Sequence, residues 1–287
     1  MIVYADGAFR PAAEAGFPLQ ERGVMFADGV YEVVRYDGGR PFGMQPHIDR
    51  LKRSLDGIGL TGLDTDAVAG LSDELVKLNG CPDCKVYWQV TRGEAGPRNF
   101  IIPDQTEPNL VLIAYPSDPI DRDAPLQPGP GLIVEDCRWT KCWIKSLMLL
   151  PASLAKTAAA KAGAVEAIFE RQKPGTDQAH ITEGGSTNLF IVRDGELHTH
   201  PDDGWILGGI TRDTLIRSAR EDLGLNVQET AFTAQELKAA DEVFVCSTTQ
   251  LSPVTELEGQ SIGTGNTGSL TEKLHRAYLD RILEGRD

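Results

Sequence analysis

The stretch PSDPIDRDAPLQPGPG, residues 116–131, divides the chain. Proline, glycine and aspartate fill most of its positions, and these residues interrupt helices and strands because they favour turns and restrict the backbone. Exposed segments of this composition commonly separate domains. We therefore predict a small N-terminal domain over residues 1–118, a linker over 119–130 and a larger C-terminal domain, containing Lys145, over 131–287.

Helical and strand patterns alternate on both sides of this linker. Before it, apolar spacing predicts helices, and runs of β-branched and aromatic residues predict strands joined by Asp-Gly turns. The predicted elements are helices at 48–58 and 68–78, strands at 85–92 and 109–115, then a strand at 132–135, an alanine-rich helix between Pro151 and Gly163, a helix at 211–223, a strand at 242–246 and a helix at 270–283. Strands joined by hairpins and interleaved with helices favour an α+β fold over a doubly wound parallel sheet.

Composition narrows the classes of function. The chain has 287 residues and a net charge of −14, which argues against nucleic acid or an anionic membrane as a partner. An anionic ligand must then be held by a local cluster of donors. The five cysteines are an odd number and favour a reducing compartment over a disulfide framework. The N-terminus resembles no signal peptide and no apolar run reaches membrane-spanning length, so we expect a soluble cytoplasmic protein.

Cys81 and Cys84 have the CxxC spacing of redox and zinc sites. No second pair follows at zinc-site spacing, and no thioredoxin-like βαβ pattern surrounds them. We interpret Cys81-Pro82-Asp83-Cys84 as a turn after a helix, and the sequence predicts no metal site.

Lys145 is the first candidate for chemistry, within WTKCWIKSLMLL at residues 139–150. Two tryptophans precede it and an apolar run follows, so its side chain is expected to be partly desolvated. Desolvation disfavours the ammonium form, and a neutral amine is the nucleophile of Schiff-base enzymes. The alternative is a surface lysine whose stem lies along the apolar segment while its ammonium stays in water.

Three features could bind a phosphate. The segment LGGITRD at residues 207–213 has two glycines, which make the backbone flexible and accessible, and it leads into a predicted helix. Thr211 is the expected N-cap of that helix. The hydroxyls of Ser247, Thr248 and Thr249 follow a predicted strand, and Arg50 lies beside the apolar face of a predicted helix, where its planar fork can reach an anion. Each has an ordinary alternative, namely a capped helix start, a turn and a solvated arginine.

Glu183 stands alone as an acid in ITEGGSTNLF, residues 181–190. A carboxylate at this turn could pair with a ring nitrogen and keep a pyridinium protonated. The alternative is an exposed acid in a β-turn. Residues 263–268 match GxGxxG, but the chain ends one helix later, so we interpret them as a lead into the last helix and not as a dinucleotide site.

Seven segments in order resemble class IV aminotransferases, which are pyridoxal 5′-phosphate (PLP) enzymes of fold type IV. These segments are Phe26–Glu32, His47–Leu51, Val90–Gly93, Ile144–Leu147, Thr182–Asn188, Gly209–Arg212 and Ser247–Thr249. The resemblance covers nearly the whole chain and is greatest to D-amino-acid aminotransferases. Branched-chain aminotransferases and aminodeoxychorismate lyases share the fold. The family fold implies two α/β domains with PLP between them, and a homodimer.

The resemblance also implies roles for individual residues. Lys145 would form the Schiff base with PLP and then move the substrate proton, and Glu183 would pair with the pyridine nitrogen. The other implied cofactor ligands are Arg50, Ser186, Thr187, Asn188, Leu207, Gly209, Ile210, Thr211, Ser247 and Thr248, and the implied substrate-binding residues are Tyr31, Val33, Arg98 and Thr249.

The implied reaction moves an amino group from a D-amino acid to a 2-oxo acid, 2-oxoglutarate or pyruvate, by a ping-pong mechanism. One departure matters, because Phe100 stands where D-amino-acid enzymes of the family often have a histidine two residues after Arg98. Losing one charge-assisted partner would weaken carboxylate binding by about 1.5–3 kcal/mol. The alternatives are an (R)-selective amine transaminase, a branched-chain aminotransferase, a PLP lyase, and a non-catalytic binding protein on the same fold.

Overall fold

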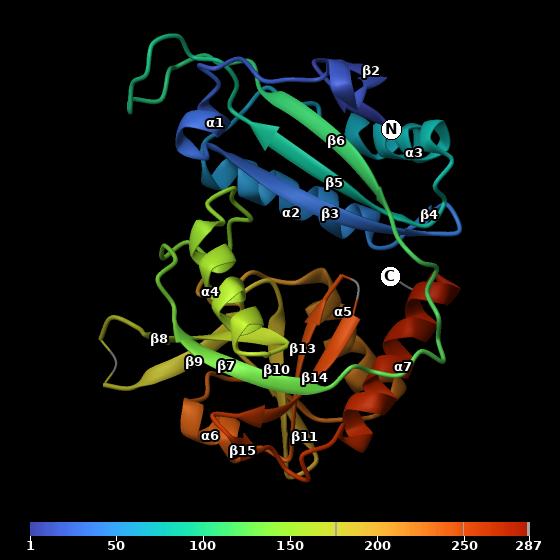
Figure 1. Ribbon diagram of the computed structural model, residues 1–287, viewed down its shortest axis with the longest axis vertical. Helices are drawn as coiled ribbons and strands as arrows, with labels where there is room; N and C mark the ends of the chain where they lie inside the picture. The colour runs from blue at the N-terminus through green and yellow to red at the C-terminus, as the bar shows by residue number, and fades with distance from the viewer. Residues whose placement is uncertain (176, 249, 286–287) are drawn as a thin grey trace. The chain divides into compact units, whose positions relative to one another are not determined.

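The computed structural model describes residues 1–175, 177–248 and 250–285. Its chain divides into two units, one formed by Met1–Ile120 with Ile144–Met148 and the other by Asp121–Trp143 with Leu149–Asp287 (Figure 1). Each unit has its own sheet and its own helices. Within the described residues, no helix is both long and apolar enough to cross a membrane.

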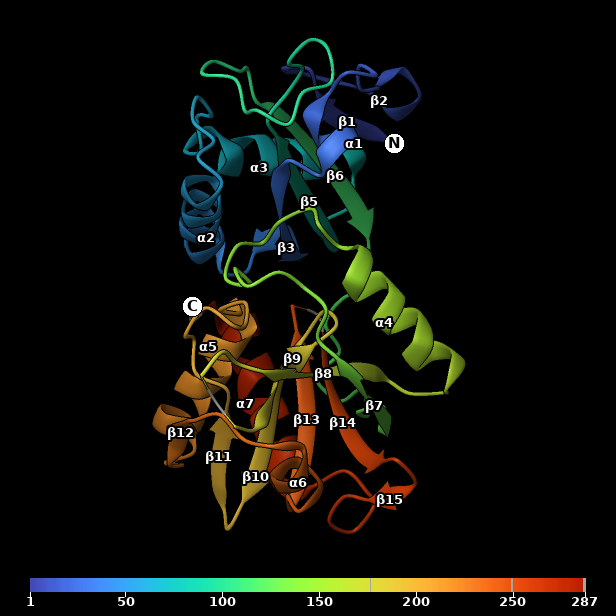
Figure 2. The same ribbon diagram turned by 90° about the vertical axis from the view of Figure 1, so that its left-hand side faces the viewer.

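The first unit is built on an antiparallel sheet with the strand order β2-β1-β6-β5-β3-β4. Its elements are β1 (Ile2–Ala5), β2 (Ala8–Pro11), η1 (Ala12–Glu14), α1 (Arg22–Phe26), β3 (Gly29–Asp37), β4 (Arg40–Pro41), α2 (Met44–Gly57), α3 (Ala67–Asn79), β5 (Cys84–Thr91) and β6 (Asn109–Pro116). Helices α2 and α3 cover one face of this sheet (Figure 2). Their apolar stripes bury Leu51 and Leu75 fully, together with Trp88 of β5 and Leu112 of β6.

Residues 144–148 join the first unit through backbone pairing with β3. The Tyr31 N–H donates to the Lys145 carbonyl at 2.9 Å, and the Leu147 N–H donates to the Gly29 carbonyl at 3.0 Å. Val30 and Ser146 form an antiparallel bridge between these bonds. The structure thus groups Lys145 with the first unit, which differs from its expected place in the larger C-terminal domain. The remaining boundaries of the predicted domains stay a prediction.

The second unit carries a mixed sheet with the order β12-β11-β10-β13-β14-β7-β8-β9 in its described part, and β15 pairs with β14. Its elements are β7 (Gly129–Glu135), α4 (Leu150–Lys161), β8 (Glu166–Gln172), β9 (Ala179–Gly184), β10 (Asn188–Arg193), β11 (Glu196–Thr199), α5 (Ile210–Arg217), η2 (Ser218–Asp222), β12 (Val227–Glu229), α6 (Ala234–Lys238), β13 (Glu242–Ser247), β14 (Gln250–Leu257), β15 (Gln260–Ser261) and α7 (Ser269–Glu284). Helix α4 connects the parallel strands β7 and β8, whereas most neighbouring strands are antiparallel. This mixture confirms the predicted α+β class.

The core of the second unit has two sides. On one side, buried apolar residues of β8, β9, β10, β13 and β14 pack around Phe232 and Leu237. On the other, Phe190 and Phe244 stack with their ring centroids 5.1 Å apart. The alternation of side chains along β10 and β13 therefore supplies apolar residues to both faces, which is why these strands read as continuous hydrophobic runs.

Candidate active site

Lys145 is fixed at both of its backbone polar groups. Its N–H donates to the Ser54 hydroxyl of α2 at 3.2 Å, and its carbonyl accepts from the N–H of Tyr31 in β3. The half-buried side chain places Nζ 4.3 Å from the centroid of the Tyr31 ring, close enough for a cation–π contact. The amine of Lys145 is thus held against an aromatic face, and the side chain is not free at the surface.

Strand β3 separates two groups of side chains by its alternation. Tyr31 and Val33 are half-buried and point to one face, whereas Glu32 between them is fully buried and points to the other, toward α2. The Tyr31 ring lies 5.8 Å from the ring of Tyr87 on the neighbouring strand. Tyr31 and Val33, two of the four residues expected to bind substrate, therefore share one face of the sheet.

Glu32 is the centre of a buried charge network that the sequence analysis missed. Both carboxylate oxygens accept from Arg50 at 2.7 Å, through Nε and Nη2, and His47 Nδ1 lies 2.7 Å from Oε2. Burial alone would raise the pKa of Glu32, but the Arg50 guanidinium and His47 hold it well below its usual range. Burial lowers the pKa of His47. Part of the Arg50 fork is therefore engaged by Glu32, and its expected role at a phosphate stays a prediction.

Arg98 lies in the loop between β5 and β6. Its guanidinium carbon is 4.8 Å from the centroid of the Phe100 ring and 5.2 Å from that of Phe26. Both Arg98 and Phe100 are exposed. The structure thus brings Arg98 together with the residue that departs from the family pattern.

Glu183 of the second unit lies at the end of β9 and is 4% exposed, so the alternative of an exposed acid in a turn is wrong. Its carboxylate accepts from Arg138 Nη1 at 2.6 Å, from Asn188 Nδ2 at 3.1 Å and from the Leu207 N–H at 3.1 and 3.2 Å. Burial raises its pKa, and the charge of Arg138 opposes that rise. The result is an immobilised buried carboxylate beside a cation.

Arg138 also went unnoticed in the sequence. It binds both oxygens of Asp136 at 2.9 Å, and its guanidinium carbon lies 4.3 Å from the ring centroid of Phe169. Arg171 supports the same Asp136 at 2.9 Å. The only local signal is the Asp-x-Arg spacing after a predicted strand, which is too common to indicate a site.

The glycine-rich loop before α5 differs from the expectation in one detail. The N-cap of α5 is Gly209 and not Thr211, which lies in the first turn of the helix and is buried. The backbone N–H groups of that turn have no partner within the helix, which suits an anion. A Cβ on Gly209 would lie 1.9 Å from Asn188 Oδ1, so the close approach of β10 requires glycine there. Thr211 Oγ1 lies 3.3 Å from the Tyr278 hydroxyl.

The remaining expected cofactor ligands form two groups. Asn188 Nδ2 donates to the Leu207 carbonyl at 2.9 Å as well as to Glu183, so it ties these two candidates together. The hydroxyls of Ser186 and Thr187 contact Glu166 Oε2 at 3.4 and 3.1 Å, and their expected contact with the cofactor edge stays a prediction.

Three hydroxyl residues were expected after β13. Ser247 ends that strand and Thr248 follows it in a turn, and both are half-buried. Thr249 lies outside the described residues. Within the part of the chain that the structure describes, no group of three or more His, Cys, Asp or Glu side chains is arranged to hold a metal ion.

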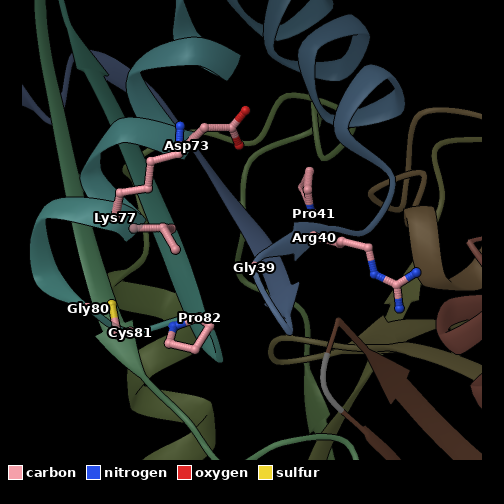
Figure 3. Close-up of a pocket in the computed structure, with 9 residues that line it drawn as sticks. Gly39, Arg40, Pro41, Asp73, Lys77, Gly80, Cys81 and Pro82 are labelled. Carbon is pink, nitrogen blue, oxygen red and sulfur yellow. The ribbon is translucent and has the colours of Figure 1, made fainter.

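A surface cavity of about 420 Å³ lies in the first unit at the end of α3 (Figure 3). It is lined by Gly39, Arg40, Pro41, Asp73, Val76, Lys77, Gly80, Cys81 and Pro82, and by none of the candidate residues. Cys81 follows the left-handed Gly80 that ends α3, and Cys84 begins β5, so the CxxC segment forms the predicted turn.

The donor set fits PLP. The cofactor needs an amine for its aldehyde, an anion for its ring nitrogen and backbone donors for its phosphate. The first unit has such an amine in Lys145, and the second unit has such an anion in the buried Glu183 and such donors in the first turn of α5.

Comparisons with known proteins agree with this chemistry. The family model for class IV amino-transferases matches residues 29–257. A D-alanine aminotransferase of Listeria monocytogenes serotype 4b (strain F2365) is 39% identical over 274 residues, which cover 94% of this chain and 92% of that protein. A D-alanine aminotransferase of Staphylococcus aureus (strain N315) is 37% identical over 280 residues, which cover 96% of each chain.

Solved structures show the same fold. A branched-chain aminotransferase of the thermophilic archaeon Thermoproteus uzoniensis, solved with norvaline, matches with a TM-score of 0.85 and 25% identity, covering 100% of this chain and 96% of that one. The Escherichia coli branched-chain amino acid aminotransferase matches with a TM-score of 0.85 and 22% identity over 98% and 94% of the two chains. The fold type IV architecture is thereby confirmed. The chain belongs to the class IV aminotransferase family and is a pyridoxal-phosphate-dependent aminotransferase.

Proposed function

We propose that this aminotransferase moves an amino group from a D-amino acid to a 2-oxo acid such as 2-oxoglutarate or pyruvate, by a ping-pong mechanism. The observation that carries the proposal is its likeness to D-alanine aminotransferases over 94% of its length. D-Alanine is accordingly the first donor to test.

Lys145 is the proposed catalytic residue. Bound PLP would supply an aldehyde for the Schiff base and an electron-withdrawing ring. Nζ of Lys145 would be the amine that holds this aldehyde, and as a free amine it would be the base that takes a proton from the substrate Cα. The backbone bonds of Lys145 to Ser54 and Tyr31 keep the base in place during both tasks.

Glu183 is the proposed partner of the pyridine nitrogen. A buried carboxylate that stays ionised favours a protonated ring nitrogen, which strengthens the pull on the substrate electrons. Arg138 supports this role because its charge opposes the protonation that burial favours at Glu183. Asn188 and the Leu207 N–H orient the carboxylate.

The first turn of α5 is the proposed phosphate site. The N–H groups of Ile210 and Thr211, with Gly209 leaving room, suit phosphate oxygens. Further phosphate ligands are proposed by resemblance in Arg50, Ser247 and Thr248. Leu207 would pack on the ring face, and Ser186 to Asn188 would support its edge.

Tyr31, Val33, Arg98 and Thr249 are the proposed substrate ligands. Tyr31 and Val33 share one face of β3, which suits two walls of one pocket. Arg98 would bind the substrate carboxylate with its planar fork.

A homodimer is also proposed. Exposed apolar side chains gather in the first unit on α1 and on the β5–β6 loop, namely Val24, Phe100, Ile101 and Ile102. Exposed apolar groups of this kind favour a covering partner. All five cysteines are free, which supports a cytoplasmic location.

A panel of half-reactions tests the donor. Holoenzyme is mixed with D-alanine, L-leucine or (R)-1-phenylethylamine without an acceptor, and loss of the cofactor absorbance band is followed. We expect D-alanine to react fastest. A response to L-leucine alone would favour a branched-chain enzyme. Because the half-reaction of a transaminase with D-alanine itself yields one pyruvate per active site, only release of pyruvate over many turnovers without any 2-oxo acid would favour a lyase.

One observation favours a second candidate. Phe100 replaces a polar residue of the family with an exposed ring, which suits an amine that lacks a carboxylate. A fast response to (R)-1-phenylethylamine with none to D-alanine would assign the chain as an amine transaminase.

A further inference from the structure

The loop that carries Arg98 is attached to α1 by an arginine. Arg22 Nη1 donates to the Asn99 carbonyl at 2.8 Å, and the Ile101 N–H donates to Asn99 Oδ1 at 3.0 Å. Arg22 is itself held by Asp28, with Nε 2.7 Å from Oδ2. The loop therefore has a defined conformation next to α1, although its side chains are exposed.

Arg98, Phe26 and Phe100 form a nearly equilateral triangle. The guanidinium carbon lies 5.2 and 4.8 Å from the two ring centroids, which are themselves 5.4 Å apart at an interplanar angle of 50°. Rings on opposite faces of a guanidinium would lie about twice that far apart. The two rings thus form a corner on one side of Arg98.

The guanidinium of Arg98 forms no ion pair among the described residues, whereas two neighbouring arginines share one carboxylate. Arg22 and Arg92 both bind Asp28 Oδ2, at 2.7 and 2.8 Å. The guanidinium of Arg98 lies against the rings of Phe26 and Phe100. A guanidinium held by ring contacts keeps its N–H donors for an in-plane anion, and a carboxylate is the anion whose geometry matches that fork.

We propose that Phe26 and Phe100 are positioning residues that orient Arg98 for the substrate carboxylate, so that Phe100 makes this chain selective for donors with a carboxylate. The inference rests on the proposed function of Arg98. In this role Phe100 favours substrates that have a carboxylate, whereas an apolar pocket wall would favour amines that lack one. The aromatic corner restricts the long arginine side chain before the substrate arrives, which lowers the entropy cost of binding.

A double-mutant cycle tests this role. The variants are Phe100→Leu, Arg98→Ala and the double variant, with Phe100→Tyr as the conservative change and Phe26→Leu as a second removal of a ring. The readouts are KM and kcat for D-alanine, and the calorimetric affinity for propionate, which is D-alanine without its amino group. Size-exclusion chromatography checks that the oligomeric state is unchanged.

Loss of either ring should raise KM and the dissociation constant of propionate about two- to thirty-fold, the range of one cation–π contact. The value of kcat should stay within about twofold, and Phe100→Tyr should match the wild type. In the Arg98→Ala background, Phe100→Leu should have no further effect. An equal effect of Phe100→Leu with and without Arg98 would overturn the inference.

These experiments distinguish failure of the proposed function from failure of this inference about Phe26 and Phe100. Turnover of D-alanine by the wild type tests that function alone. Propionate binding needs no turnover and tests the orienting role of the rings in either case. Wild-type protein that does not bind propionate would overturn that role.

Discussion

Arg138 and Glu183 form a buried ion pair in which Nη1 lies 2.6 Å from Oε1. Two more donors, from Asn188 and Leu207, converge on the same carboxylate. The Glu183 carboxylate is therefore shielded from water, and these donors set its orientation before any ligand binds. The charge of Arg138 therefore acts directly on the carboxylate that we propose as the partner of the pyridine nitrogen.

Arg138→Met should lower the free energy of unfolding and shift the pH dependence of kcat/KM. Removing one partner of a buried pair costs about 3–5 kcal/mol. Burial already raises the pKa of Glu183, and without Arg138 that pKa rises further, so the acid limb of kcat/KM should move to higher pH. Urea denaturation and a pH–rate profile measure the two effects. Arg138→Lys keeps the charge and should restore most of the profile; equal profiles for wild type and Arg138→Met would contradict the role.

Glu32→Gln should change how stability depends on pH. The folded state holds the pKa of Glu32 below its ordinary value of 4.5, so the unfolded chain takes up the proton first as the pH falls. This contribution is complete above about pH 4.5 and is lost progressively as the pH falls from there toward the lowered pKa of the folded state. The variant should be about 3–5 kcal/mol less stable at neutral pH, with a flatter acid dependence. Asp66→Asn, at the exposed pair with Lys52, is the matched control and should change stability by under about 0.5 kcal/mol.

Lys145→Ala should abolish turnover and the Schiff-base absorbance while the protein still folds. The backbone bonds of residue 145 do not involve its side chain, so the pairing with β3 should survive. Absorbance, circular dichroism and D-alanine turnover are the measurements. Lys141→Ala, an exposed lysine in the same segment, should behave as the wild type. Normal turnover by Lys145→Ala would end the proposal.

Gly209→Ala should weaken cofactor binding by displacing Asn188. The backbone at Gly209 is extended, with φ of −81°, so the damage comes from the Cβ that would approach Asn188 Oδ1 to 1.9 Å. We expect a loss of about 1–3 kcal/mol of stability, typical of overpacking, and weaker binding of PLP in a fluorescence titration. Gly70→Ala in α3, where a Cβ meets nothing within 4 Å, should instead stabilise the protein by about 0.5–1 kcal/mol.

The sequence predicted what depends on local pattern. Helices α2 and α3 span Met44–Gly57 and Ala67–Asn79, close to the predicted 48–58 and 68–78, because their apolar stripes repeat at the helical period. It could not predict partners that depend on tertiary contact. Glu32 and Arg50 are 18 residues apart, and Arg138 and Glu183 are 45 apart, and no spacing rule connects them.

Other misses have local causes. Thr211 was expected as a cap because threonine favours that position, but the helix begins two residues earlier, with Gly209 as its N-cap, where the close approach of Asn188 leaves no room for a side chain. The pairing of Ser146 with Val30 is a single bridge, too short to leave a strand pattern, so the membership of Lys145 in the first unit was not foreseen.

The alternation along β3 constrains how this enzyme can diversify. Tyr31 and Val33 point to one face, and Glu32 points to the other into its charge network. Inserting or deleting one residue in this strand would turn all the side chains on one side of the change to the opposite face, away from their present partners. Changes at Tyr31 and Val33, the proposed substrate ligands of this strand, must therefore arise by point substitution, with strand length held constant through evolution or engineering.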